Sequence, residues 1–172
     1  MSKFRVALCL AALSAPTLAW SQSAPNTSPA AVQAGDYVVD PAHTQVGFTV
    51  SHMGFSYYSG RFSDVSGVLD LKPNDAATST VHITVPVKSV STTSSKLDGE
   101  LKGADWLDAT KYPDMSFRST KVTPGQSGEA QVAGDLTLHG VTKPVTLNVH
   151  FVGSGTNPIS KKYDAGFRSP AT

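Results

Sequence analysis

Residues 128–152, GEAQVAGDLTLHGVTKPVTLNVHFV, decide the fold, because they form two alternating runs joined by a turn. Each run places apolar side chains on one face and mostly polar ones on the other. A period of two over this length predicts strands with one buried and one solvated face. Gly140 permits a positive φ in the turn, and Pro144 stands at the entry to the second strand, where a missing N–H costs little. The stretch therefore predicts an antiparallel hairpin, whose apolar face needs a second sheet or barrel closure to cover it.

Four other segments repeat this alternation. We expect strands at 45–51 and 81–90, a long bent strand region at 57–71, and a further strand at 114–122. Residues 94–107 instead carry apolar residues three and four apart, which predicts a short helix capped by Ser94 or Ser95. The sequence thus predicts an all-β fold, an extended antiparallel barrel of about eight strands with one short helical excursion.

The beginning of the chain has the composition of a secretory signal peptide. Lys3 and Arg5 precede an apolar run at 6–13, and small residues follow. The run is short and is interrupted by Ser14 and Pro16, so a membrane anchor is less favoured and stable membrane insertion is not expected. We expect a cleaved signal peptide at 1–21, a flexible leader at 22–35, one domain at 36–172, and a periplasmic location.

The composition of the chain limits which stabilising cross-links and which binding partners are expected. Cys9, the only cysteine, lies within the expected signal peptide, so the exported domain has to rely on its core and not on disulfides. The chain has 14 basic and 13 acidic residues, a balance that gives no reason to expect a nucleic-acid partner. A homodimer is compatible with the sequence.

Four ordered blocks resemble the YceI family of exported, lipocalin-like barrels. They are YVVDPAHTQVGFTVSHMG at 37–54, GRF at 60–62 with SGVLDL at 66–71, LDGELKGADWLDATKYPDMSF at 97–117, and GDLTLHGVTKPVTLNV at 134–149. The resemblance implies that the barrel interior holds a polyisoprenoid chain, such as the tail of an isoprenoid quinone or of a polyprenyl carrier.

The end of the chain departs from this family pattern. The family continues after the motif seen here as DAGF (164–167) with a further strand, whereas this sequence gives RSPAT. Pro170 cannot donate to a sheet ladder. We therefore expect a C-terminally truncated or divergent member whose barrel is incomplete at its last strand, unless residues 163–167 already close the sheet.

The inward phases of the expected strands give a set of candidate ligand-binding residues. They are Phe48, Val50, Phe62, Leu69, Ile83, Val85, Val87, Phe117, Leu136, Leu138, Leu147, Val149 and Phe151. Each residue of this set can equally be ordinary barrel core, and for any single one packing is the favoured interpretation. His43 and His52 are polar candidates: they either hydrogen-bond a ligand head group at a barrel mouth or tie strand ends together, and the second role is favoured.

Enzymatic motifs are not recognisable in the sequence. It contains no nucleophile elbow, no H-E-x-x-H, no paired-cysteine site and no glycine-rich phosphate loop before a helix, so we predict a protein that is not an enzyme and needs no metal or cofactor. Two functions remain open. One is periplasmic binding or transport of an isoprenoid lipid, and the other is a non-catalytic structural or stress-related envelope protein whose barrel is filled by its own side chains.

Overall fold

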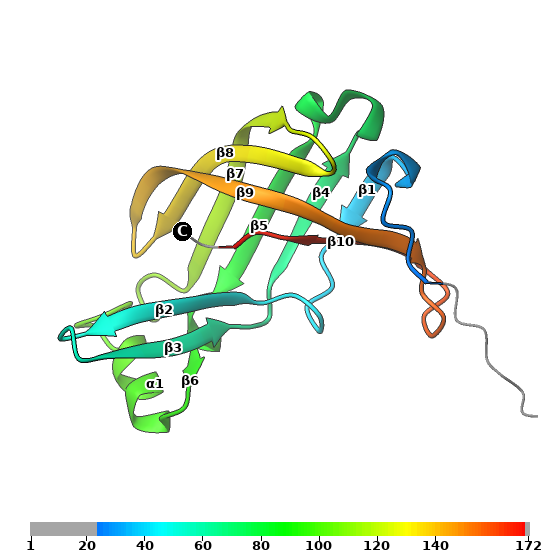
Figure 1. Cartoon of the computed structure of the whole chain (residues 1–172). Helices are drawn as coiled ribbons and strands as arrows, with labels where there is room; N and C mark the ends of the chain where they lie inside the picture. Colours follow the sequence, from blue (N-terminus) through cyan, green and yellow to red (C-terminus); the bar gives the residue numbers. More distant parts are fainter. Residues whose placement is uncertain (1–23, 171–172) are drawn as a thin grey trace, which may run out of the picture.

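A computed structural model describes residues 24–170, which form ten strands in two antiparallel sheets (Figure 1). The larger sheet runs in the order β1 (Gly35–Val38), β4 (Ser66–Leu71), β5 (Thr80–Pro86), β7 (Asp114–Pro124), β8 (Glu129–Leu138), β9 (Val141–Thr156) and β10 (Tyr163–Arg168). The smaller sheet has the order β2 (Val46–His52), β3 (Ser56–Phe62) and β6 (Ser91–Thr92). The larger sheet curls into a half-barrel, and strands make up 52% of the structure, which confirms the predicted all-β, lipocalin-like class.

The β8–β9 hairpin is longer than the sequence predicted. Leu138 pairs with Val141, so the loop contains only His139 and Gly140, at φ values of 52° and 73°. Two residues at positive φ match the right-handed twist of the strands that they join. Pro144 therefore lies within β9 and not at its entry. Because β10 pairs with β9 only from His150 onward, Pro144 stands where one side of β9 is a free edge and no donor is needed.

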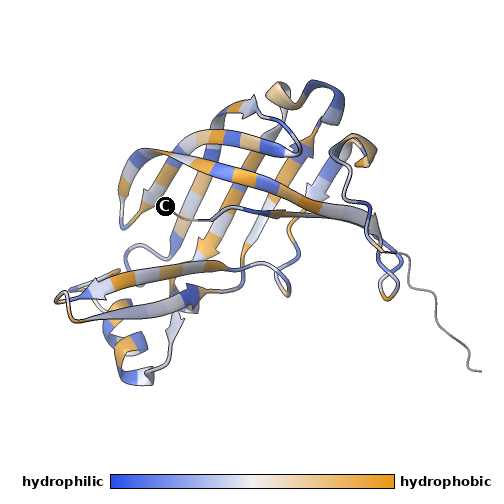
Figure 2. Cartoon of the chain, in the orientation of Figure 1, coloured by the Kyte–Doolittle hydropathy of each residue, from blue (hydrophilic) through white to orange (hydrophobic). Residues whose placement is uncertain are grey.

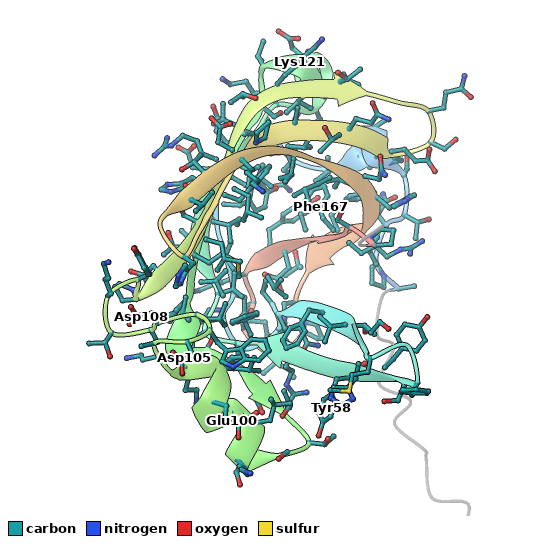
Figure 3. The ribbon with its side chains drawn as sticks, turned by 90° about the vertical axis from the view of Figure 1, so that its left-hand side faces the viewer. Tyr58, Glu100, Asp105, Asp108, Lys121 and Phe167 are labelled. Atoms are coloured by element: carbon teal, nitrogen blue, oxygen red, sulfur yellow. The ribbon has the colours of Figure 1, made fainter. Side chains whose placement is uncertain are left out.

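The register confirms the predicted faces of this hairpin. Val132 lies opposite Leu147, and Ala130 lies opposite Val149, so these apolar residues share one face of the sheet. Coloured by hydropathy, the strands of the larger sheet show alternating apolar and polar bands (Figure 2). The apolar face points into the curl, and Lys121 lies on the outside (Figure 3).

Two expected strands end earlier than predicted. Residues 57–71 are not one bent region: β3 ends at Phe62, and the chain crosses through Asp64, at a φ of 57°, into β4 of the other sheet. β5 ends at Pro86 instead of continuing to residue 90, because a 3-10 turn, η3 (Val87–Ser89), follows the proline. Alternation does not record which sheet a strand joins, so the sequence could not separate β3 from β4.

The predicted helix is present as α1 (Ser95–Lys102). Ser94 caps it by accepting a hydrogen bond from the Leu97 N–H at 3.4 Å. The side chain of Asp98 accepts hydrogen bonds from the N–H and the hydroxyl of Thr92, both at 2.7 Å, and so ties the helix to β6.

The buried core lies where the two sheets meet. It contains Phe62 of β3 together with Val65, Val85, Val87, Val90 and Met115, and Val87 is 0% exposed. Leu101 of α1 and Leu107 after it pack against this cluster. The core therefore joins one end of the half-barrel to the smaller sheet and to the helical block, by which we mean α1 and the segment after it as far as Leu107.

Residues 24–34, which fall within the expected flexible leader at 22–35, make contacts with the sheet. Asn26 and Ser154 of β9 exchange backbone hydrogen bonds of 2.8 and 2.9 Å. A short 3-10 helix, η1 (Pro29–Ala31), follows and places Pro29 over Gly128. The composition of this segment is polar, but its backbone groups find partners in β9, and sequence patterns do not report such pairing.

The expected signal peptide at 1–21 lies outside the described residues. Within residues 24–170, no helix has the length and apolar content needed to cross a membrane.

The inward phase of β8 can be tested by a matched pair of substitutions. Val132 is buried at 7% exposure, whereas Gln131 beside it faces outward and is exposed. Val132→Asp should lower the free energy of unfolding by about 2 kcal/mol or more, because a buried carboxylate has no partner there. Gln131→Asp should change it by less than about 0.5 kcal/mol. Urea denaturation measures both values, and similar losses would show that the assigned phase is wrong.

Candidate functional site

The inner face of the half-barrel is an apolar surface that the strands of the larger sheet share. Its side chains come from β4, β5, β7, β8, β9 and β10, and they follow the registers of these strands across the sheet. We define the inner face by Leu69, Leu71, Val81, Ile83, Phe117, Val132, Leu136, Val145, Leu147, Val149, Phe151 and Phe167. Most of these side chains are only half-buried, although all are apolar.

The structure divides the predicted ligand-binding residues into two groups. Those of the first group belong to the core or pack against it, namely Phe48, Phe62, Ile83, Val85, Val87, Leu136 and Leu138. Phe117 is buried nearby at 7% exposure. In the second group Leu69, Leu147, Val149 and Phe151 are half-buried on the inner face, and Val50 is exposed on β2. A ligand can therefore reach the second group without displacing the core.

Phe167 belongs to the inner face but was missed by the sequence analysis. Its ring packs edge-on against Phe151 with the ring centroids 5.6 Å apart, and it lies within the curl of the sheet (Figure 3). A register shift between Gly166 and Phe167 lets Phe167 pair directly with Phe151. Strict alternation groups Phe167 with Tyr163 and Ala165, whereas the register shift moves it to the face of Phe151, so the period-two pattern of the sequence could not show its phase.

Two tyrosines bring β1 and β10, the two edge strands of the larger sheet, close together. The rings of Tyr37 on β1 and Tyr163 on β10 are 6.5 Å apart. The Tyr37 hydroxyl donates to the Gln33 carbonyl at 2.8 Å, and the Tyr163 hydroxyl donates to the Ser154 hydroxyl at 2.8 Å. Burial raises the pKa of Tyr37, and the neighbouring Tyr163 raises it further. Both tyrosines are thus linked to the N-terminal segment at 24–34, Tyr37 through Gln33 and Tyr163 through Ser154, which bonds to Asn26.

A glycine on β3 makes room for an aromatic pair on β2 and β3. Phe48 lies directly opposite Gly60, and its ring covers the space where a Cβ of residue 60 would stand. The Phe48 and Phe62 rings are 5.5 Å apart. This pair continues the apolar inner surface from the buried core along the smaller sheet.

The two predicted histidines lie at opposite ends of β2, so they do not form one head-group site. His43 precedes β2, and its Nδ1 lies 2.7 Å from the Asp40 carboxylate within the same exposed loop. His52 is the last residue of β2, and its ring lies 6.4 Å from that of Tyr58 on β3. His43 therefore ties its own loop together.

The charges around His43 stabilise its protonated form. The hydrogen bond to Asp40 is the largest cause of a raised His43 pKa, and the charge of Asp164 on β10 adds to it. The same hydrogen bond, followed by one from the Ala42 N–H, lowers the pKa of the Asp40 carboxyl.

Other potential sites offer less. Within residues 24–170, no three His, Cys, Asp or Glu side chains are grouped so that they could hold a metal ion. A hollow of about 430 Å³ lies between residues 24–25 and the β9–β10 turn. It is lined mainly by small and polar residues from Gly153 to Pro158, with Asp164 and Gly166, and it contains none of the inner-face side chains.

The contact between Gly60 and Phe48 predicts a selective effect of an added methyl group. Gly60→Ala should lower the free energy of unfolding by about 1–3 kcal/mol, because the new Cβ displaces the Phe48 ring. Gly47→Ala is the matched control, since a Cβ at Gly47 would meet nothing within 4 Å. Thermal and urea denaturation measure both changes, and equal effects would contradict the packing described.

The Asp40–His43 pair predicts a defined pH window. The contribution of His43 is complete below 6.5, its ordinary pKa, and is lost as the pH rises through the raised value. The contribution of Asp40 is complete above 3.8 and is lost as the pH falls through the lowered value. The loop should therefore be held best between these two pH values.

Nuclear magnetic resonance titration of the His43 imidazole tests this pair. Asp40→Asn should lower the His43 pKa toward 6.5, because the main hydrogen-bond partner loses its charge. Asp36→Asn removes a charge from the same region without touching this hydrogen bond and should leave the titration nearly unchanged. An unchanged His43 titration in Asp40→Asn would exclude the pair in solution.

Comparison with known proteins agrees with the geometry. The model of the YceI-like domain matches residues 37–172. The chain is 42% identical to a UPF0312 protein of Vibrio parahaemolyticus over an alignment of 132 residues. This alignment covers 76% of this chain and 70% of that protein. It is 39% identical over 147 residues to a UPF0312 protein of Shewanella baltica, covering 84% of this chain and 76% of that protein.

Two solved structures share the fold. Burkholderia cenocepacia BcnA is 29% identical with a TM-score of 0.63, covering 69% of this chain and 74% of that chain. A Campylobacter jejuni YCEI protein is 34% identical with a TM-score of 0.60, covering 76% of both chains. The fold and these relatives are consistent with the binding of a hydrophobic ligand.

Proposed function

This chain belongs to the YceI family, and on that premise we propose that its inner face binds the hydrocarbon chain of a polyisoprenoid lipid, of the isoprenoid quinone or polyprenyl carrier type. The proposed role is non-catalytic binding or transport. The proposal rests on one observation: apolar side chains along β9 remain half-buried, while the core beside them is fully packed.

The inner side of β9 has the chemistry that a long hydrocarbon requires. Val145, Leu147, Val149 and Phe151 follow one another at every second residue, and these four positions carry no charged or hydrogen-bonding side chain. Each buried methylene contributes about 0.8 kcal/mol, so one five-carbon isoprene unit contributes roughly 3–4 kcal/mol before ordering costs. A few units along this strand would therefore suffice for tight binding.

The exposure of these side chains also separates the proposal from its alternative. A structural protein with a barrel filled by its own side chains would bury the inner face throughout. Here burial is complete near Val87 and Met115 but only partial at Leu147 and Val149. This gradient favours a surface that a ligand completes.

The expected signal peptide at 1–21 supports a periplasmic site of action. An exported carrier would meet isoprenoid lipids at the membranes that bound this compartment. We therefore place the binding event in the periplasm as part of the proposal.

Adjacent residues on β9 provide a matched test of lipid binding. Val149 faces inward, whereas Asn148 faces outward and is exposed. Val149→Lys should reduce affinity for a long-chain isoprenoid quinone by about tenfold or more, because it replaces apolar contact with a charge. Asn148→Lys should bind like the wild type. Fluorescence titration gives the affinities, and mass spectrometry of organic-solvent extracts identifies lipid that co-purifies.

Three results would refute this function. They are wild-type protein that neither co-purifies with nor takes up an isoprenoid, equal binding by both lysine variants, and uptake that is lost only in Asn148→Lys. Melting temperatures measured alongside ensure that any loss of binding is compared between folded proteins.

A further inference from the structure

The tip of the β2–β3 hairpin exposes apolar side chains that the fold does not use. We define the tip as Met53, Phe55 and Tyr57, whose side chains are 79%, 92% and 78% exposed. None of them belongs to the buried core or to the residues packed against it. An exposed group of large apolar side chains on a small protein marks a surface that contacts something else.

Apart from Arg61, near the end of β3 that is farthest from the tip, the hairpin that carries the tip has no formally charged side chain. From Pro41 to Gly60 the chain contains no Asp, Glu, Lys or Arg, although these residues make up 16% of the whole sequence. Exposed strand edges and hairpins are ordinarily kept soluble by charged side chains. Here uncharged polar residues and aromatic residues take the place of charged ones. Such a composition is compatible with the interfacial region between lipid head groups and acyl chains.

The backbone of the turn makes a methionine at position 53 unexpected. Met53 and Gly54 have φ values of 54° and 76°, and the Phe55 N–H donates to the His52 carbonyl at 3.1 Å. At such a position the backbone favours Asn, Asp or Gly, because a larger side chain is strained at positive φ. Folding alone would thus place a small polar residue where this chain presents an exposed methionine.

The tip is well placed for contact with a flat surface. It lies at one end of the molecule, opposite the end that carries the β9–β10 turn (Figure 1). Tyr58, beside the tip on β3, is marked in Figure 3 at the smaller sheet, below the curl that contains Phe167. Contact at the tip would leave the larger sheet clear of the surface.

From these observations we propose that the β2–β3 tip docks reversibly into the interfacial layer of a lipid bilayer. The contact is made by Met53, Phe55 and Tyr57, and apolar burial drives it. Because residues 41–60 carry no formal charge and Arg61 lies at the far end of β3, binding does not depend on anionic lipids and changes little with salt. Docking goes beyond the proposed function, since the tip lies outside the lipid-binding residues of the inner face.

A consequence for lipid transfer rests on the proposed function. Phe48 and Val50 lie on the same face of β2, and Phe48 also packs against the core beside the inner face. Docking at the tip would bring this apolar path next to the bilayer. An isoprenoid chain could then pass from membrane to protein along β2 with little exposure to water.

Flotation of the purified protein with phosphatidylcholine vesicles tests docking directly. The wild type should float with the vesicles, and its partition coefficient should change by less than about twofold between about 0.05 M and about 0.5 M salt. The triple variant Met53→Ser, Phe55→Ser, Tyr57→Ser should lose at least about tenfold in partition coefficient. The single variant Phe55→Ser should lose a measurable part of it while keeping the wild-type melting temperature, since Phe55 supports no core contact.

Ile159→Ser is the matched control. Ile159 is 91% exposed, but it lies in the β9–β10 turn at the opposite end of the molecule, near Lys161 and Lys162. Its substitution should leave vesicle binding unchanged. Val149→Lys should also float like the wild type, because docking does not require a bound lipid, so a failure of lipid binding and a failure of docking are seen separately.

Four outcomes would overturn the proposal. They are a wild type that does not float, a triple variant that floats equally well, and binding that needs anionic lipid and disappears at high salt. The fourth is a wild-type dimer in sedimentation that the triple variant converts to monomer without any vesicle binding, which would assign the tip to a second copy of the chain.

Discussion

The packing of the smaller sheet against one end of the curled sheet is the interaction on which the rest of this structure depends. Phe62 from β3 meets Val85 and Met115 from the larger sheet, and Val87 in the turn after β5 is fully buried among them. This contact covers only one end of the inner face. The apolar surface beyond it has to remain exposed, associate with another molecule, or hold a ligand.

Residues of the same type therefore have different roles along one sheet. Val85 and Val149 are both inward-facing valines, yet the first is buried by protein and the second is half-buried beside an open surface. Substituting the first would test folding, and substituting the second would test binding. The division between core and ligand surface follows from what covers each side chain, because the alternation that creates both is the same.

Segments outside the regular strands determine how the inner face ends. At one end the packed N-terminal segment, held by the hydrogen bonds of Asn26 to Ser154, brings Gln33 to the paired tyrosines 37 and 163. At the other end the helical block packs against the core, and the tilted ring of Tyr112 lies 4.6 Å from that of His139 in the β8–β9 turn. The smaller sheet carries the β2–β3 tip away from both. Binding surface, end closures and tip are thus separate parts of one scaffold.

Local chemistry was sufficient to predict much of this protein from its sequence. Period-two alternation identified the β8–β9 hairpin and placed Leu147 inward, and Ser94 marked the start of α1, because both signals depend on neighbours in the chain. The four ordered blocks identified the YceI family. Tertiary structure alone decided which inward residues are core, that β3 and β4 belong to different sheets, and that residues 24–34 are packed. Those outcomes depend on contacts between residues far apart in sequence, and neither periodicity nor composition encodes which distant surface will cover a given side chain.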